Sequence, residues 1–132
     1  MDDLIRGAIV ASPFGTLVGV RVEAIAPDRV SLRLPFRPEV TTIGDLVHGG
    51  AIAALVDVAA TAAAWSGADP AANPRGTTVG FSLNFLRGAR GQDLVATADV
   101  IQRGRTLCVI DVAVGSADGA AVARALVTYK LG

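Results

Sequence analysis

The sequence predicts a single α+β domain over residues 1–132, in which an antiparallel sheet of about six strands wraps around one long central helix. The stretch 47–66 is apolar almost all the way round and rich in alanine, the strongest helix former. Segments on either side of it alternate apolar and polar side chains with the period of a strand, and short turn sequences separate them. A helix with no polar face needs cover on every side, and a curled sheet supplies much of it.

The first half of the chain contains a hairpin. Its expected elements are, in order, a short helical turn at 1–12 ended by Pro13, strands at 16–26 and 30–34, and a loop at 35–47 that leads into the helix. The two strands join through Pro27 and Asp28, because proline presets φ and aspartate caps its own backbone in a turn. The inward side chains of the first strand are expected to be Val18, Val20, Val22 and Ala24.

The second half contains strands that form a meander. They are expected at 77–85, 93–102, 106–115 and 121–130. Turn sequences separate them, and Asp118-Gly119 is a strong hairpin signal. The alternation in 77–85 places Thr77, Val79, Phe81, Leu83 and Phe85 on one face, and Thr78, Gly80, Ser82 and Asn84 on the other.

Composition narrows the class of protein. Twelve basic residues balance twelve acidic ones, and this zero net charge argues against a nucleic-acid-binding protein. The single cysteine, Cys108, allows no intrachain disulfide, which fits a cytoplasmic protein, and we expect it to be a buried structural thiol. The acidic start of the chain does not resemble a signal peptide. We expect no membrane span, because Asp57 would lie near the bilayer centre.

The start and the middle of the central helix carry unusual residues. The helix begins after His48, the only histidine, with Gly49-Gly50, and Asp57 is its only charge. Glycines let a ligand approach the free N–H groups of a helix start, and such groups bind oxyanions. A carboxylate in an apolar helix needs a compensating partner. These residues are either a catalytic set, with the Gly49 N–H as oxyanion donor, or a purely structural one, with the histidine as helix cap.

A second copy of the chain follows from burial and from geometry. One sheet covers about half of so apolar a helix, and the remainder implies at least a dimer. His48 and Asp57 are nine positions apart, about 900° of rotation and about 13 Å along the axis, so one helix cannot place both at one small reacting group. In a two-fold dimer with antiparallel helices, Asp57 of one copy could approach Gly49 of the other.

Two motifs resemble a known family. They are H-G-G-x-x-x-x-L-x-D at 48–57, and T-V-x-x-x-L-N-F-L-R at 78–87 with the following G-A-R-G turn and the later R-G-R link. Both are similar to the hotdog-fold acyl-CoA thioesterases, in particular the PaaI-like group of phenylacetate pathways, over about residues 14–131. The resemblance implies the hotdog fold and hydrolysis of an aryl- or medium-chain acyl-CoA to the free acid and CoA. It also implies a homodimer, paired again as a dimer of dimers, and no metal or cofactor.

The resemblance assigns catalytic roles position by position. Asp57 matches the family's catalytic carboxylate, which acts as general base or as nucleophile. Gly49 matches the glycine whose N–H polarises the thioester carbonyl, and His48 matches the histidine that shapes this turn. Thr78 falls where relatives carry a serine or threonine that helps to position water or the carboxylate.

Further residues are expected to contact the substrate: Thr42, Gly50, Arg87, Arg90, Arg103 and Arg105. Thr42 replaces an asparagine that many relatives carry six residues before the histidine, and it lacks the amide's paired donor and acceptor. The arginines lie in two turns that we expect at one end of the sheet, where guanidinium groups would clamp the phosphates of coenzyme A. The alternative is that they only solubilise the turns.

Two other functions stay open at this point. A hotdog hydratase or dehydratase also acts on acyl thioesters, but the D-x-N-x-x-H string typical of hydratase relatives is absent. A non-catalytic acyl-CoA-binding module has no reason to bury a carboxylate beside a thioester. The fold alone does not separate these classes, so the helix motif is what favours the thioesterase.

Overall fold

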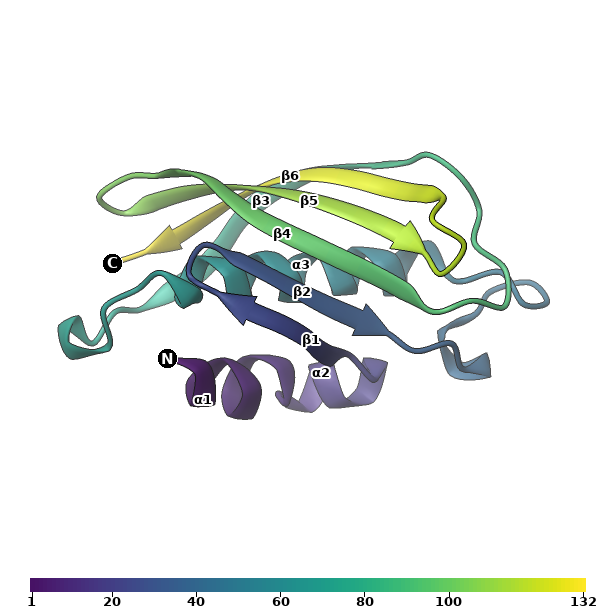
Figure 1. Cartoon of the computed structure of the whole chain (residues 1–132), viewed down its shortest axis with the longest axis horizontal. Helices are drawn as coiled ribbons and strands as arrows, with labels where there is room; N and C mark the ends of the chain where they lie inside the picture. Colours follow the sequence, from purple (N-terminus) through teal and green to yellow (C-terminus); the bar gives the residue numbers. More distant parts are fainter.

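A computed structural model describes residues 1–132 and shows one antiparallel sheet of six strands curved over one long helix (Figure 1). The strands are β1 (Arg21–Ala26), β2 (Arg29–Leu34), β3 (Gly76–Phe85), β4 (Leu94–Arg103), β5 (Leu107–Ser116) and β6 (Ala121–Leu131). Their order across the sheet is β1-β2-β4-β5-β6-β3, so β1 and β3 are the edge strands. The central helix is α3 (Gly49–Ser66). The predicted fold is therefore confirmed.

The helix α3 shares its core with the sheet. Ile52, Leu55 and Val56 are buried against inward side chains of the strands, and all the other buried positions of the helix are alanines. By length and composition α3 could cross a membrane, but half of its residues are buried inside the protein. Its apolar character is therefore that of a core helix.

The second half of the chain follows its prediction closely. Each of the strands β3 to β6 begins and ends within one residue of its predicted bounds. Cys108 on β5 is buried, as expected of a structural thiol, and burial raises the pKa of this thiol above its ordinary value.

The segment before β1 is helical where a strand was predicted. Residues 16–18 belong to α2 (Pro13–Val18), and Pro13 begins this helix instead of ending one. The hydroxyl of Ser12 caps it by accepting from the Gly15 N–H at 3.0 Å, and Gly19, with a φ of 89°, ends it. The prediction failed because the Val18-Val20-Val22 alternation outweighed the cap signal of Ser-Pro.

The first residues of the chain cover part of α3. They form α1 (Asp2–Leu4) and the π-helical segment η1 (Ile5–Val10), which lie below β1 in Figure 1, and η1 packs against α3. The side chains of Ile5 and Val10 are buried there. Part of the cover that was assigned to a second copy is therefore supplied by the chain itself.

A β-bulge in β1 changes which residues face the core. The register between β1 and β2 shifts between Val22 and Ala24. As a result Ala24 is exposed, contrary to its prediction, and Ile25 is half-buried in its place.

A second bulge lies in β3, where the register against β6 shifts between Thr78 and Gly80. Before the bulge Thr78 is opposite the buried Tyr129, so its side chain faces the helix. Beyond the bulge Phe81, Leu83 and Phe85 are opposite Val127, Ala125 and Ala123, which are also buried. The predicted alternation therefore holds after Val79 and fails before it, because Val79 is the extra residue.

Candidate active site at the start of the central helix

His48 organises the first turn of α3. It is the N-cap residue, and its Nδ1 accepts a hydrogen bond from the Gly50 N–H at 2.7 Å. Its carbonyl oxygen accepts from the N–H groups of Ala51 and Ile52. The Gly49 N–H, in contrast, donates to no group of the chain. One backbone donor is thus left free at the positive end of the helix dipole.

The free donor is held in place by the surrounding backbone and by β3. The Val47 N–H donates to the Ala89 carbonyl at 2.9 Å, and the His48 N–H donates to the Val40 carbonyl at 2.8 Å. A Cβ added at Gly49 would lie 3.3 Å from the ring of Phe85. Glycine therefore lets the helix start pack closely against the end of β3.

Asp57 has the partner that its position in an apolar helix requires. The Thr78 hydroxyl donates to Asp57 Oδ1 at 2.7 Å, and both residues are half-buried. The bulge at Val79 makes this contact possible, because it turns Thr78 toward the helix. The side chain of Asp57 is therefore held by a neutral donor and forms no salt bridge with an arginine or lysine of the chain.

A hydrogen-bonded pair of aromatic side chains, the half-buried Trp65 and the buried Tyr129, lies close to this carboxylate. The indole N–H of Trp65 donates to the hydroxyl oxygen of Tyr129 at 2.9 Å. Burial raises the pKa of Tyr129, and the negative charge of Asp57 raises it further. Tyr129 therefore stays neutral at physiological pH. Its place beside Asp57 was not foreseen, because nothing in the sequence pairs β6 with β3.

Gly49 and Asp57 do not meet within one chain. They are eight positions apart, which is about 12 Å along the helix. Gly49 lies beside Phe85 at the end of β3, whereas Asp57 lies beside Thr78 near its start. The two halves of the predicted catalytic set therefore stand at opposite ends of the same edge strand.

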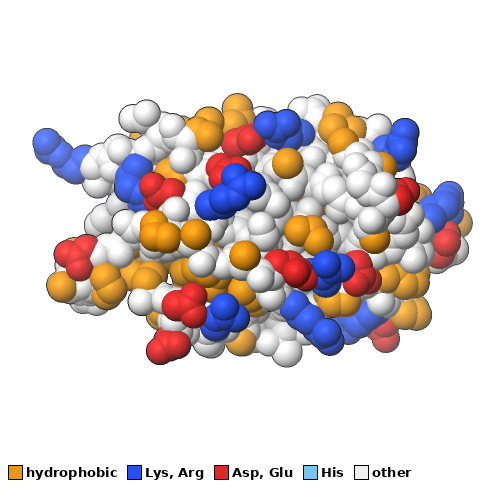
Figure 2. All heavy atoms as spheres, in the orientation of Figure 1, with side chains coloured by type: hydrophobic (Ala, Val, Ile, Leu, Met, Phe, Trp, Pro, Cys, Tyr) orange, Lys and Arg blue, Asp and Glu red, His pale blue; other side chains and the backbone are white.

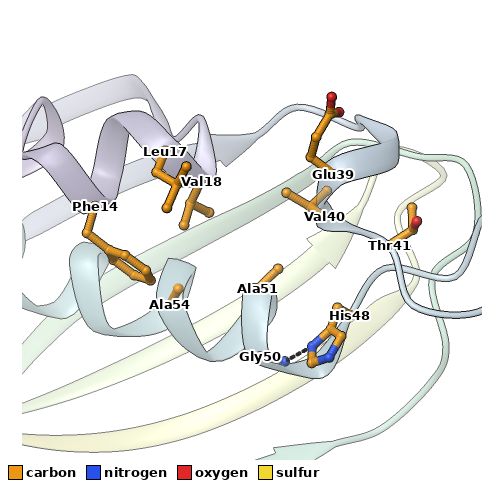
Figure 3. A pocket seen from close by; sticks show the side chains of 10 residues that line it. All are labelled: Phe14, Leu17, Val18, Glu39, Val40, Thr41, His48, Gly50, Ala51 and Ala54. Atoms are coloured by element: carbon orange, nitrogen blue, oxygen red, sulfur yellow. Dashed lines mark hydrogen bonds between the residues drawn. The ribbon is translucent and has the colours of Figure 1, made fainter.

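Two cavities flank the start of α3. The α2 cavity, of about 420 Å³, is lined by α2, residues 39–41 and the helix residues His48, Gly50, Ala51 and Ala54 (Figure 3). The β3 cavity, of about 390 Å³, is lined by Thr42, Gly49, Ile52, the end of β3 and Arg87. The predicted residues Thr42, Gly50 and Arg87 thus lie around the helix start, together with α2 side chains that were not predicted to take part.

The arginines do not form one group. Arg87 and Arg90 precede β4, whereas Arg103 ends it and Arg105 follows it. A strand of this length spans about 33 Å, so the prediction that all of them lie at one end of the sheet is wrong for a single chain. Arg90 pairs with Asp45 at 3.2 Å. Basic and acidic side chains are also mixed over the face shown in Figure 2.

Arg103 serves the opposite end of α3. Its guanidinium donates to Asp28 Oδ1 at 2.8 Å and to the Ala64 carbonyl at 3.0 Å, and it contacts the sulfur of Cys108. The contact with the Ala64 carbonyl caps the last turn of the helix, while the buried Nε of Arg103 has no hydrogen-bond partner. Arg105 is exposed in the turn between β4 and β5. Arg103 therefore holds the helix end in place within the chain, which is neither the predicted phosphate clamp nor the solubilising alternative.

The profile of the thioesterase superfamily matches residues 44–123, which include the helix start, Asp57 and Thr78. The chain belongs to the thioesterase superfamily. It is thus an enzyme of the thioester-hydrolase class, as its helix motif predicts.

Individual relatives agree with this placement. Acyl-coenzyme A thioesterase 13 of Homo sapiens is 29% identical over 135 residues, which cover 100% of this chain and 94% of the relative. The crystal structure of a thioesterase family protein from Silicibacter pomeroyi superimposes with a TM-score of 0.90 at 28% identity, over 98% of this chain and 96% of that one. The E. coli PaaI protein of the phenylacetic acid degradation operon shares the fold, with a TM-score of 0.81 at 19% identity, over 91% and 84% of the two chains.

Proposed function

We propose that this protein hydrolyses an aryl- or medium-chain acyl-CoA to the free acid and coenzyme A, at a site built by two copies of the chain. The observation that carries the proposal is that the same helix holds both a free N–H, at Gly49, and a carboxylate, Asp57, that a neutral hydroxyl holds in place. The first group suits a thioester oxygen that gains negative charge, and the second suits the activation of water.

The chemistry follows from these two groups. The thioester carbonyl oxygen accepts a hydrogen bond from the Gly49 N–H, which strengthens as that oxygen becomes an oxyanion. On one route Asp57 takes a proton from a water molecule while the water oxygen attacks the carbonyl carbon; the C–S bond then breaks, and the proton passes to the departing CoA sulfur. On the other route the carboxylate attacks the carbonyl carbon directly, and the C–S bond breaks to leave a mixed anhydride and the CoA thiolate. Water then hydrolyses the anhydride to regenerate Asp57, and a proton of that water goes to the thiolate.

The reaction needs no group beyond the protein and water. The chain has one histidine and one cysteine, and no three His, Cys, Asp or Glu side chains come together as metal ligands would. Coenzyme A enters as part of the substrate. We place this activity in the cytoplasm.

The edge strand β3 supports a shared site. Val79, Phe81 and Phe85 expose 61%, 39% and 54% of their surface, and the outer backbone of an edge strand is free to pair with another strand. An antiparallel pair of β3 strands with its two-fold axis between Phe81 and Ser82 would place Thr78 of one copy opposite Phe85 of the other. Asp57 of the partner copy would then approach Gly49.

The half-buried stripe of α3 supports the same arrangement. Asp57 lies on it with Val58, Thr61 and Trp65, at helical spacing and on the side that neither the sheet nor η1 fully covers. A second copy packed here would complete the burial of the helix. Further pairing of two dimers into a tetramer stays a prediction.

The test is release of CoA from a panel of aryl and alkyl acyl-CoAs by wild type and by Asp57→Asn. We expect wild type to hydrolyse members of the panel, and the variant to lose 10²-fold or more in kcat, the scale for removal of a catalytic base. If the folded wild type hydrolyses no thioester, the proposed activity is rejected and the alternative, a non-catalytic acyl-CoA-binding module, is favoured. Activity that survives the substitution would place the carboxylate elsewhere.

A mixing experiment tests the shared site. Gly49→Pro removes the free N–H, and Asp57→Asn removes the carboxylate. If each site takes one group from each copy, refolding the two inactive variants together at equal amounts gives half mixed dimers with one intact site each, or about a quarter of wild-type activity. Asp57→Asn mixed with Asp57→Ala is the control and should recover nothing. No recovery in the first mixture would contradict the shared site.

A further inference from the structure

We infer that the two ends of the substrate enter from opposite sides of the helix start: the acyl group occupies the α2 cavity, and the pantetheine arm of coenzyme A passes through the β3 cavity. The assignment depends on the proposed thioesterase function and names the part of the chain that selects the acyl group. Its basis is the different chemistry of the two cavities and their common border at residues 48–50.

The α2 cavity has apolar walls on both sides. Phe14, Leu17 and Val18 of α2 point toward Ala51 and Ala54 of α3 across the cavity (Figure 3). Phe14 and Leu17 expose 56% and 72% of their surface, which is unusual for large apolar side chains on a short helix. An apolar group in the cavity would remove this surface from water.

The few polar groups of the α2 cavity do not suit a phosphate. Its only charged lining residue is Glu39, whose carboxylate points outward from the rim in Figure 3. The hydroxyl of Thr41 is already used, because it donates to the Pro38 carbonyl at 2.7 Å. A negative rim repels the phosphates of coenzyme A, and it also disfavours an acyl group that ends in a carboxylate.

The β3 cavity has the opposite charge. Arg87 is its only charged lining residue, and this exposed guanidinium forms no ion pair within the chain. Arg90, three positions on, is held by Asp45. A guanidinium matches the geometry of phosphate oxygens, so Arg87 is suited to meet the phosphates once the pantetheine arm lies in this cavity.

The helix start places the reacting bond between the cavities. Gly49, with its free N–H, lines the β3 cavity, whereas His48 and Gly50 line the α2 cavity. A thioester whose carbonyl oxygen accepts from the Gly49 N–H can therefore extend its carbon chain to one side and its sulfur to the other. The charges decide which end lies on which side.

Ala54 and Phe14 set the size of the α2 cavity. Ala54 lines its floor with one methyl group, so leucine at this position would shorten the cavity. Phe14 lines the facing wall and is largely exposed, so alanine at this position would lengthen the cavity without emptying the core. The two substitutions should move the preferred acyl length in opposite directions.

The experiment measures kcat/KM for straight-chain acyl-CoAs from acetyl to dodecanoyl and for phenylacetyl-CoA, with wild type, Ala54→Leu, Phe14→Ala and Arg87→Ala. We expect Ala54→Leu to reduce kcat/KM about fourfold for every methylene that no longer fits, with the smallest loss for acetyl-CoA, while inhibition by free CoA stays unchanged. Phe14→Ala should move the optimum to longer chains. Arg87→Ala should weaken inhibition by free CoA and lower kcat/KM equally for all acyl groups.

Each other outcome overturns the assignment. If Ala54→Leu weakens inhibition by CoA and leaves the acyl profile unchanged, the two ends of the substrate are reversed. If Phe14→Ala, a surface change that the fold should tolerate, alters the oligomeric state in size-exclusion chromatography and not the profile, a second copy occupies the cavity. If wild type releases CoA from no substrate, the proposed function itself is wrong. If wild type is active and the variants do not change the acyl profile as expected, only the assignment of the cavities is wrong.

Discussion

The two ends of α3 are satisfied in different ways. At the C-terminal end Arg103 donates to the Ala64 carbonyl, the Ser66 hydroxyl donates to the Ala63 carbonyl at 2.7 Å, and the Asp28 N–H donates to Ser66 Oγ at 2.9 Å. At the N-terminal end the Gly49 N–H has no partner in the chain, and a cavity opens on each side.

The difference shows that the C-terminal end of α3 anchors the helix, whereas the N-terminal end leaves a backbone donor available to a ligand. Helix ends leave unpaired backbone groups, and a protein normally satisfies them with side chains or other backbone. Here the C-terminal end is tied to the β1–β2 turn and to the end of β4, which fixes the helix against the sheet. The N-terminal end keeps the Gly49 N–H free, and the hydrogen bonds of the Val47 and His48 N–H groups fix the backbone just before it.

The largest expected effect is the loss of the free N–H at Gly49, which two substitutions can distinguish from the loss of the glycine itself. Gly49→Pro removes the N–H at the first helical position, where proline is tolerated, and the extended ψ of 133° at His48 suits a following proline. We expect kcat to fall about 10²- to 10³-fold, the scale for loss of an oxyanion donor. Gly49→Ala keeps the N–H and introduces the same contact with Phe85, so it is the matched control. Equal losses in both variants would mean that packing, and not the donor, matters.

The next effect concerns the satisfied end. Arg103→Met keeps the aliphatic stem and removes the hydrogen bonds to Asp28 and Ala64, so we expect the free energy of unfolding to fall by about 2 kcal/mol. Thermal denaturation should show a Tm lower by several degrees, with kcat/KM nearly unchanged. Arg105→Met, in the same turn but exposed, should alter neither. A rise in KM with unchanged stability would contradict this structural role and would support the predicted contact of Arg103 with the phosphates of coenzyme A.

The smallest expected effect is the contribution of Asp93 to stability, which acts on the loop that leads to the N-terminal end of α3. The Phe36 N–H donates to Asp93 at 2.7 Å and Arg33 donates to it at 3.1 Å, and the first of these bonds does most to hold the pKa of Asp93 below its ordinary value. The resulting stabilisation is complete above the unfolded pKa near 4 and is lost as the pH falls through the lower folded pKa. Asp93 is partly exposed, so we expect less than about 1 kcal/mol.

Urea unfolding across acidic pH measures this contribution. Asp93→Asn should be less stable than wild type at pH 7, and the difference should shrink as the pH falls below about 4. A difference that stays constant down to pH 2 would mean that the substitution acts through packing and not through the charge of Asp93.

The fold could be predicted from the sequence wherever patterns are local and regular. The strands of the second half alternate cleanly, and alanine together with Gly49-Gly50 marks the helix and its start. The prediction failed where a strand-like alternation and a helix-capping signal overlap in the same segment. The valines at 18, 20 and 22 alternate like a strand, although Ser12-Pro13 and Gly19 begin and end a helix there.

For the candidate site, the sequence singled out individual residues but did not indicate what surrounds them. His48, Gly49, Asp57 and Thr78 were chosen from spacing and resemblance, and the structure shows the Asp57–Thr78 bond. The α2 cavity was missed because Phe14 lies far from the helix in the sequence and was assigned to no element. The separation of the arginines was missed because turn residues carry no sign of which end of the sheet they occupy.

The bulge in β3 has a consequence for the length of that strand. Val79 is the residue without a partner on β6, since Thr78 is opposite Tyr129 and Gly80 is opposite Thr128. Deleting Val79 would therefore remove the bulge and leave every other side chain of β3 on its present face. Homologous chains can differ in length by one residue here and still keep a hydroxyl on the carboxylate and phenyl rings toward the core.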